Sequence, residues 1–304
     1  MPDAAGSPVF NTAEMRRKIR AIGTAISPET LGEAMKLYAP FHPGEPYQGV
    51  RLTRDIKYGP DERNRLDLFL PLALARDLPV MIYVHGGGFT GGDKKNPAFP
   101  YYDNVMLWAV RHGMAGVNIT YRLAPKHKWP SGNQDIANVV LWIQRHGPEH
   151  GLDPKRVFLM GQSAGASHVA QYIAHPQYQP DGNPGIVAGL LVSGIYDIAH
   201  SHNNRVNKAY FGEDEKEWKI QTALPGLINF RLPLLITVAE NDPPDFERQA
   251  LSLLAGLYAR DDRLPWFQRL WGHNHISAML HVGLEKDDQL GDLILDFIAT
   301  ECPA

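Results

Sequence analysis

Ser163 is flanked by two glycines where an apolar segment gives way to a run of small residues, in FLMGQSAGASHVAQ. A serine hydroxyl becomes a nucleophile only when a base takes its proton, so a hydrolytic serine must be exposed and held beside that base. A sharp strand-to-helix turn provides the exposure, and its close backbone approaches require residues without a side chain. Gly161 and Gly165, two positions before and after Ser163, meet this requirement. We therefore expect a nucleophile; the alternative is a glycine-rich turn that only lets the following helix pack closely.

An acidic residue that orients the base is expected after a later strand. The apolar segment 234–238 is followed by three carboxylates, at Glu240, Asp242 and Asp245. Asp242 is our candidate for the orienting acid. Glu240 and Asp245 stay open as alternatives, and are otherwise expected to be solvated loop carboxylates.

The base is expected to be a histidine on a late loop. His273 and His275 both follow the predicted strand 266–271. With His275 as the base, the constellation runs Ser163, Asp242, His275, which is one of the chain orders in which such triads occur. We expect His273 to be a neighbouring loop residue.

A tetrahedral acyl intermediate carries an oxyanion that needs preorganised N–H donors, each contributing about 3 kcal/mol. The segment HGGGF at residues 85–89 follows the apolar segment 80–84, and its glycines let the backbone approach a substrate oxygen. The backbone N–H groups of Gly87, Gly88 and Ala164 are the expected donors. The alternative for the three glycines is a flexible hairpin or an anion-binding turn.

The apolar segments of the chain predict the scaffold that would bring these residues together. They are short, rich in β-branched and aliphatic residues and without clean alternation, which is typical of strands buried on both faces of a parallel sheet. Amphipathic helical patterns separate them, so we expect an α/β layered domain. Two earlier segments, 50–58 and 65–70, are joined by a tight turn and predict antiparallel strands at one edge. The expected parallel strands are at residues 80–84, 117–120, 157–160, 186–192, 234–238 and 266–271.

Two regions depart from this alternation. Residues 1–45 contain two predicted helices, with Asn11 and Ser27 as their N-caps. Residues from about 196 to 230 are polar and irregular before they become rich in aromatic residues. We expect the two regions to form a helical cap over the ends of the strands, and residues 46–304 to form the catalytic domain.

The composition of the 304-residue chain excludes several classes of protein. Its net charge of -3 argues against a nucleic-acid partner, and the basic run at residues 16–18 is expected to be a solvated helix face. No apolar run is long enough to cross a bilayer, and no signal peptide is recognisable. Because Cys302 is the single cysteine, a reducing, cytoplasmic location is expected.

The 13 histidines include three closely spaced pairs, but none accompanies cysteines or clustered carboxylates at a zinc-like spacing, so we expect no metal. Surface or loop positions are the better interpretation. The pairs are His146/His150, His200/His202 and His273/His275.

At the level of motifs the chain resembles the α/β-hydrolase superfamily and, within it, is similar to the hormone-sensitive-lipase-like bacterial carboxylesterases. The resemblance covers roughly residues 50–300, and Gln162 departs from the acidic residue that is usual in that family. In the family the catalytic histidine directly precedes a hydrophobic residue, as His275 precedes Ile276. The motifs that carry the resemblance are HGGGF at residues 85–89, YRLAP at 121–125, DP at 153–154 and GQSAG at 161–165.

The resemblance implies an α/β-hydrolase fold with a small helical cap and a cofactor-free serine carboxylesterase that acts on small to medium esters. Phe89 is the expected neighbour of the substrate pocket. Family members often pair through an edge strand, so a homodimer is an expectation as well. Arylformamide or feruloyl-ester cleavage by the same triad is the near alternative, and a non-catalytic ligand-binding protein is the alternative from another class.

Overall fold

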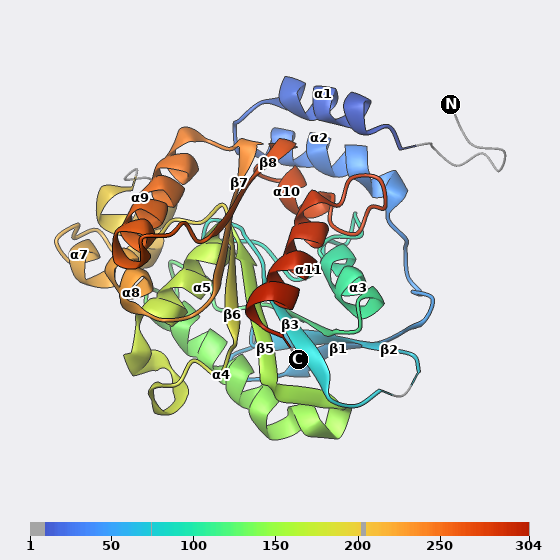
Figure 1. Cartoon of the computed structure of the whole chain (residues 1–304), viewed down its shortest axis with the longest axis horizontal. Coiled ribbons are helices and arrows are strands. Elements are labelled where there is room, and N and C mark those ends of the chain that lie inside the picture. Colours follow the sequence, from blue (N-terminus) through green and yellow to red (C-terminus); the bar gives the residue numbers. More distant parts are fainter. Residues whose placement is uncertain (1–9, 74, 202–204, 304) are drawn as a thin grey trace.

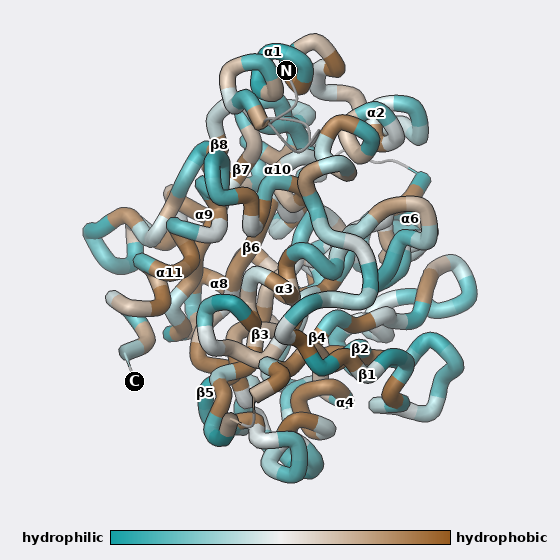
Figure 2. Tube along the Cα trace, turned by 90° about the vertical axis from the view of Figure 1, so that its right-hand side faces the viewer, coloured by the Kyte–Doolittle hydropathy of each residue, from teal (hydrophilic) through white to brown (hydrophobic). Residues whose placement is uncertain are grey.

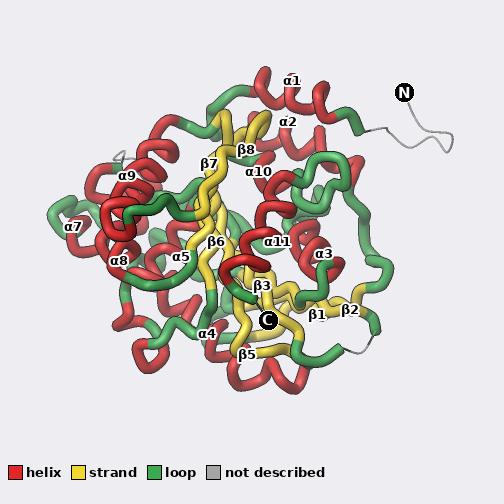
Figure 3. The backbone as a smooth tube through the Cα atoms, viewed as in Figure 1, coloured by secondary structure: helices red, strands yellow, loops and turns green. Residues whose placement is uncertain are grey.

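A mixed β-sheet forms the centre of the molecule in the computed structural model, which describes residues 10–73, 75–201 and 205–303 (Figures 1 and 3). The eight strands of the described residues are ordered β1-β2-β4-β3-β5-β6-β7-β8. β2 pairs antiparallel with β1 and with β4, and all other neighbours are parallel. The predicted sheet with a mixed edge is therefore confirmed. The strands are β1 (Val50–Lys57), β2 (Arg65–Pro71), β3 (Leu78–Val84), β4 (Ala115–Ile119), β5 (Leu152–Gln162), β6 (Ala188–Val192), β7 (Leu234–Asn241) and β8 (Trp266–Asn274).

Helices cover both faces of this sheet, with α4, α5, α8 and α9 on one side and α3 and α11 on the other (Figure 1). 3₁₀ turns of three or four residues follow α2, α4 and α5 and precede α6. The α-helices are α1 (Thr12–Ile22), α2 (Pro28–Tyr38), α3 (Asp103–Arg111), α4 (Ser131–His146), α5 (Ala164–Ala174), α6 (Arg205–Phe211), α7 (Trp218–Gln221), α8 (Leu224–Asn229), α9 (Pro244–Asp261), α10 (Ser277–Leu280) and α11 (Gln289–Glu301).

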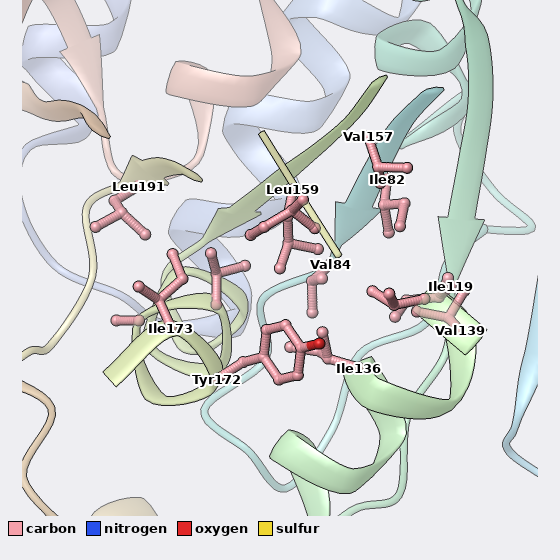
Figure 4. Packing of buried hydrophobic residues seen from close by; sticks show 14 of the residues in the cluster. Ile82, Val84, Ile119, Ile136, Val139, Val157, Leu159, Tyr172, Ile173 and Leu191 are labelled. Atoms are coloured by element: carbon pink, nitrogen blue, oxygen red, sulfur yellow. The ribbon is translucent and has the colours of Figure 1, made fainter. Parts of the chain in front are cut away.

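Alternate residues of one strand supply the two hydrophobic cores, which explains why the strands lack an amphipathic pattern. In β3, Ile82 and Val84 face α4 and α5, whereas Met81 and Tyr83 face α3 and α11. Figure 4 shows the first core, in which Ile82 and Val84 of β3 belong to the same cluster as Ile136 of α4. Each fully buried aliphatic side chain stabilises the fold by about 1.5–3 kcal/mol. The hydropathy colouring places the apolar stretches at the central strands (Figure 2).

The two predicted N-terminal helices are present at one end of the sheet (Figure 1). Asn11 caps α1 by accepting a hydrogen bond from the Glu14 backbone N–H at 3.0 Å. Ser27 caps α2 in a reciprocal capping box with Thr30. The apolar faces of both helices pack together with Ile276 and the residues of α10, close to the end of β8.

Only part of the predicted 196–230 region extends over the strand ends. α8 packs against α5 and α9 and contributes Leu227 to the core. α6 lies near the glycine loop at residues 86–88, where a Cβ atom on Gly88 would be 3.2 Å from Val206. His202, Asn203 and Asn204 of the predicted cap, residues 1–9, and Ala304 at the end of the predicted catalytic domain lie outside the described residues.

No helix within the described ranges combines the length and the apolar character needed to cross a lipid bilayer.

Buried histidines make the folded chain sensitive to acid. Burial lowers the pKa of His42 and of His85 to about 4, and that of His168 to about 3. It also lowers the pKa of His281, and that of His273 well below its ordinary value. The unfolded chain, with histidine pKa values near 6.5, therefore binds protons that the folded chain does not. The stabilisation is fully present above pH 6.5 and is lost as the pH falls toward these lowered values.

His168 allows a direct test, because neither of its ring nitrogens has a hydrogen-bond partner among the described residues. The free energy of unfolding of the wild type is expected to fall as the pH is lowered from 6 to 4.5. In His168→Leu we expect this slope to be smaller by about 1.4 kcal/mol per pH unit, because one fewer proton binds on unfolding. Urea unfolding of both proteins across this range measures the two slopes. Parallel curves would contradict the prediction, whatever the stability of the variant at pH 7.

Candidate active site

The three predicted triad residues meet at one edge of the sheet. Ser163 follows β5, Asp242 follows β7 and His275 follows β8. β5, β7 and β8 run parallel in the sheet, so their carboxyl ends lie at the same edge. Such an edge is where open α/β sheets bind ligands.

Ser163 occupies the sharp turn that its flanking glycines predict. Its backbone has φ +57° and ψ -123°, a strained conformation for a residue with a side chain. A Cβ atom on Gly161 would lie 2.4 Å from the carbonyl carbon of Gly165, and one on Gly165 would lie 2.0 Å from the carbonyl oxygen of Val84. Both positions therefore require glycine for steric reasons, and the turn leaves Ser163 partly exposed.

Asp242 holds the imidazole of His275. The Nδ1 atom of His275 lies 2.7 Å from Oδ1 of Asp242, and both side chains are buried. A carboxylate accepts, so this contact places the ring proton on Nδ1 and leaves Nε2 as the basic nitrogen. The ring also packs on Phe246, with 4.4 Å between the ring centroids.

A cavity of about 1230 Å³ is lined by both Ser163 and His275. Nε2 of His275 is buried and has no hydrogen-bond partner among the described residues. No hydrogen bond joins Ser163 to His275 in this state; catalytic hydrogen bonds are often longer before substrate binds. Apolar parts of the lining come from α2 and its approach, at Ile26, Leu31 and Met35, and from Ile195, Val206, Phe246 and Ile276.

Gly87, Gly88 and Ala164 line the same cavity, as expected for oxyanion donors. Gly87 has φ +126° and Gly88 has φ +57°, so the loop depends on glycine there. Ala164 is the first residue of α5, where the helix dipole favours negative charge. No described residue accepts a hydrogen bond from any of these three backbone N–H groups.

The YRLAP motif supports the oxyanion loop. The Tyr121 hydroxyl donates to the His85 carbonyl oxygen at 2.9 Å, and the two rings stack with centroids 4.4 Å apart. The backbone N–H of Ala124 donates to the carbonyl oxygen of Phe89 at 2.9 Å. Phe89 borders the cavity but is only 3% exposed, and its ring stacks on Tyr210 at 4.7 Å.

Two polar residues of the site were missed by the sequence analysis. The Ser193 hydroxyl donates to Oδ2 of Asp242 at 2.6 Å, from a backbone with φ +51°. The Gln162 side-chain amide donates to the carbonyl oxygen of His275 at 2.9 Å. Ser193 directly follows β6, the neighbour of β5 and β7, so its place at a strand end was a usable signal.

The alternative acids and base have other partners. Oε2 of Glu240 accepts from the Gly272 backbone N–H at 2.6 Å, and Asp245 pairs with Arg248 at 3.3 Å. Nδ1 of His273 lies 3.2 Å from the Ser277 hydroxyl. Within the ranges that the structure describes, no group of three or more histidine, cysteine, aspartate or glutamate side chains could hold a metal ion; His202 lies outside these ranges.

Solved structures share this architecture at low sequence identity. Esterase B of Lactobacillus rhamnosis, solved with a tributyrin phosphonate, matches 95% of this chain and 96% of its own with a TM-score of 0.72 at 19% identity. The hyperthermophilic esterase of Pyrobaculum calidifontis matches 96% of this chain and 98% of its own, with a TM-score of 0.70 at 19% identity. The chain thus has the α/β-hydrolase fold.

The BD-FAE family model matches residues 66–189 of the chain. Esterase LipQ of Mycobacterium tuberculosis is 30% identical over 217 residues, which cover 68% of this chain and 50% of that protein. The kynurenine formamidase of Salmo salar is 29% identical over 206 residues, which cover 64% of this chain and 65% of that protein. The chain thus spans half to 65% of the length of these two relatives.

Proposed function

We propose that this chain is a serine carboxylesterase that hydrolyses small to medium carboxylic esters through an acyl-enzyme intermediate. The observation that carries the proposal is the 2.7 Å contact between His275 and Asp242: His275 lines the same cavity as Ser163, and its Nε2 has no hydrogen-bond partner among the described residues. This arrangement matches the roles of nucleophile, base and orienting acid.

In the proposed reaction Nε2 of His275 accepts the Ser163 hydroxyl proton as the oxygen attacks the ester carbonyl carbon. The N–H groups of Gly87, Gly88 and Ala164 donate to the oxyanion, whose collapse expels the alcohol with the proton from the imidazolium. Water then attacks the acyl-enzyme with His275 as the base, and the acid leaves. Asp242 keeps Nδ1 protonated and stabilises the imidazolium throughout.

The cap is part of the proposal. Residues of the N-terminal region, among them Leu31 and Met35, line the cavity together with the glycine loop, and Arg205 and Val206 of α6 line it as well. A cavity of about 1230 Å³ is larger than a short ester needs, and its lining includes apolar side chains suited to an acyl or alcohol group. The cytoplasmic location and the homodimer expected from the sequence stay predictions.

Arylformamide cleavage is the second candidate, because a kynurenine formamidase is related to this chain at a similar level of identity to esterase LipQ. The same triad would attack a formamide carbonyl. Arg205 and Lys95 at the cavity could then face the carboxylate of a substrate such as N-formylkynurenine. Lys95 already pairs with Glu45 at 2.6 Å, so Arg205 is the better placed of the two.

Parallel assays separate these substrates. We expect p-nitrophenyl esters of two to eight acyl carbons to be hydrolysed with kcat/KM at least tenfold higher than N-formylkynurenine or methyl ferulate, with the Ser163→Ala protein as the blank. Higher kcat/KM for N-formylkynurenine would overturn the esterase assignment in favour of a formamidase. No turnover of any of them, together with no labelling by a fluorophosphonate, would favour a non-catalytic ligand-binding protein.

A further inference from the structure

The turn that presents His275 is closed by its own polar side chains. Oδ1 of Asn274 accepts from the backbone N–H groups of Ile276 and Ser277, at 3.2 and 3.0 Å. The Ser277 hydroxyl oxygen in turn accepts from the Asn274 backbone N–H at 2.9 Å. His275 lies inside this closed turn, so a shift of Ser277 would move the imidazole relative to Ser163.

His273 connects this turn to a buried carboxylate. Its Nδ1 lies 3.2 Å from the Ser277 hydroxyl, and its Nε2 lies 3.6 Å from Oδ2 of Asp287. A neutral His273 ring can accept from the Ser277 hydroxyl at Nδ1, although that hydroxyl also has the Asn274 carbonyl oxygen at 3.5 Å; Nε2 of His273 and Oδ2 of Asp287 pack against each other without a hydrogen bond. Burial lowers the pKa of His273 well below its ordinary value, in agreement with this neutral ring.

Asp287 receives its counter-charge from the N-terminal helix. The Asp287 side chain is fully buried, and its Oδ1 accepts from Nη2 of Arg16 in α1 at 2.8 Å. Arg16 packs so closely that a Cβ atom on Gly272 would lie 2.2 Å from its side chain. The prediction that residues 16–18 form a solvated face is therefore wrong for Arg16, although Arg17 and Lys18 are exposed.

A second arginine of α1 is linked, through Glu240, to the part of β8 that precedes this turn. Nη2 of Arg20, one helical turn after Arg16, donates to Oε2 of Glu240 at 3.0 Å. The same oxygen accepts from the Gly272 backbone N–H at 2.6 Å. α1 therefore contacts β8 near Gly272, just before His275, through Arg16 directly and through Arg20 by way of Glu240. The two arginines are four residues apart, a spacing that puts both on one helix face.

We propose that Arg16 is a positioning residue which, through Asp287, His273 and Ser277, fixes the turn that carries His275. The proposal rests on the proposed function and deepens it: docking of α1 sets the position of the base. A displacement of about 1 Å at a reacting group lowers turnover by up to about 100-fold. Loss of Arg16 is therefore expected to lower kcat and to leave KM nearly unchanged, because no described cavity-lining residue belongs to this connection.

The test compares Arg16→Met, Arg16→Lys and the Arg16→Met/Asp287→Asn double variant in the full chain, with Arg17→Met as the matched control on the exposed face of α1. The readouts are kcat and KM for p-nitrophenyl butyrate, urea unfolding, and the low-field NMR signal of the proton on Nδ1 of His275. The double variant leaves no unpaired buried charge, so it is expected to fold even where Arg16→Met alone does not.

We expect kcat to fall at least tenfold in Arg16→Met and in the double variant, with KM within twofold and a broadened or lost low-field signal. Arg16→Lys is expected to recover most of kcat, and Arg17→Met to match the wild type. A double variant that regains both stability and kcat would overturn the proposal, as would a kcat within twofold of wild type in Arg16→Met. If the wild type hydrolyses no ester, the proposed function fails separately, and the low-field signal still tests the positioning.

Discussion

Ser163→Ala is expected to lower kcat for the preferred ester by about 10⁶-fold, to the residual rate that the oxyanion donors and binding provide. The reason is that alanine removes the only atom that the proposed mechanism joins to the acyl group. Ser163 occupies a turn with φ +57° that alanine can also adopt at a similar strain, so the fold should persist. Initial-rate assays at saturating substrate measure the loss, and urea unfolding verifies the fold.

Ser252→Ala is the matched control, because Ser252 is an exposed serine of α9 whose hydroxyl donates only to the Arg248 carbonyl oxygen. Its kcat should equal that of the wild type. A Ser163→Ala protein that keeps more than a hundredth of the wild-type kcat would contradict the assignment of the nucleophile.

Asp242→Asn is expected to lower kcat by about 10⁴-fold. Asp242 accepts three hydrogen bonds, from Nδ1 of His275, from the Ser193 hydroxyl and from the Ala239 backbone N–H at 2.7 Å. An asparagine that keeps the last two contacts through its oxygen turns its amide N–H₂ toward His275. The ring must then accept at Nδ1 and carry its proton on Nε2, where it can no longer act as the base.

Glu240→Gln separates the two candidate acids. Glu240 contacts the Gly272 backbone and Arg20 rather than an imidazole, so this change should lower kcat by less than tenfold. A larger loss of kcat in Glu240→Gln than in Asp242→Asn, with both proteins folded, would reverse the assignment of the acid.

Much of the sheet was predictable because strands that are buried on both faces need apolar residues at nearly every position. The segments at 80–84 and 157–160 are apolar at nearly every position, and in the structure each residue of β3 except Pro79 is buried in one of the two cores. The ends of strands were less predictable. β8 continues to Asn274, beyond the predicted end at residue 271, because His273 and Asn274 are buried among polar partners that hydropathy does not reveal.

In the candidate site, too, some residues were predictable from local sequence and others were not. Ser163 and the glycine loop carry local signals, since steric contacts over a few residues require glycine around them. The link between Arg16 and Asp287 spans 271 positions, and no local pattern marks Arg16 as different from Arg17. Ser193 follows a strand end, which is a local signal, but its contact with Asp242 spans 49 positions and has no local pattern.

The most direct test of the central claim is covalent labelling of the folded protein with a fluorophosphonate, followed by mass spectrometry of its peptides. We predict a single adduct on Ser163, formed at a rate that falls at least 1000-fold in His275→Gln, because the hydroxyl is nucleophilic only while the imidazole accepts its proton. An unlabelled wild type, an adduct on another residue, or a labelling rate that does not depend on His275 would contradict it.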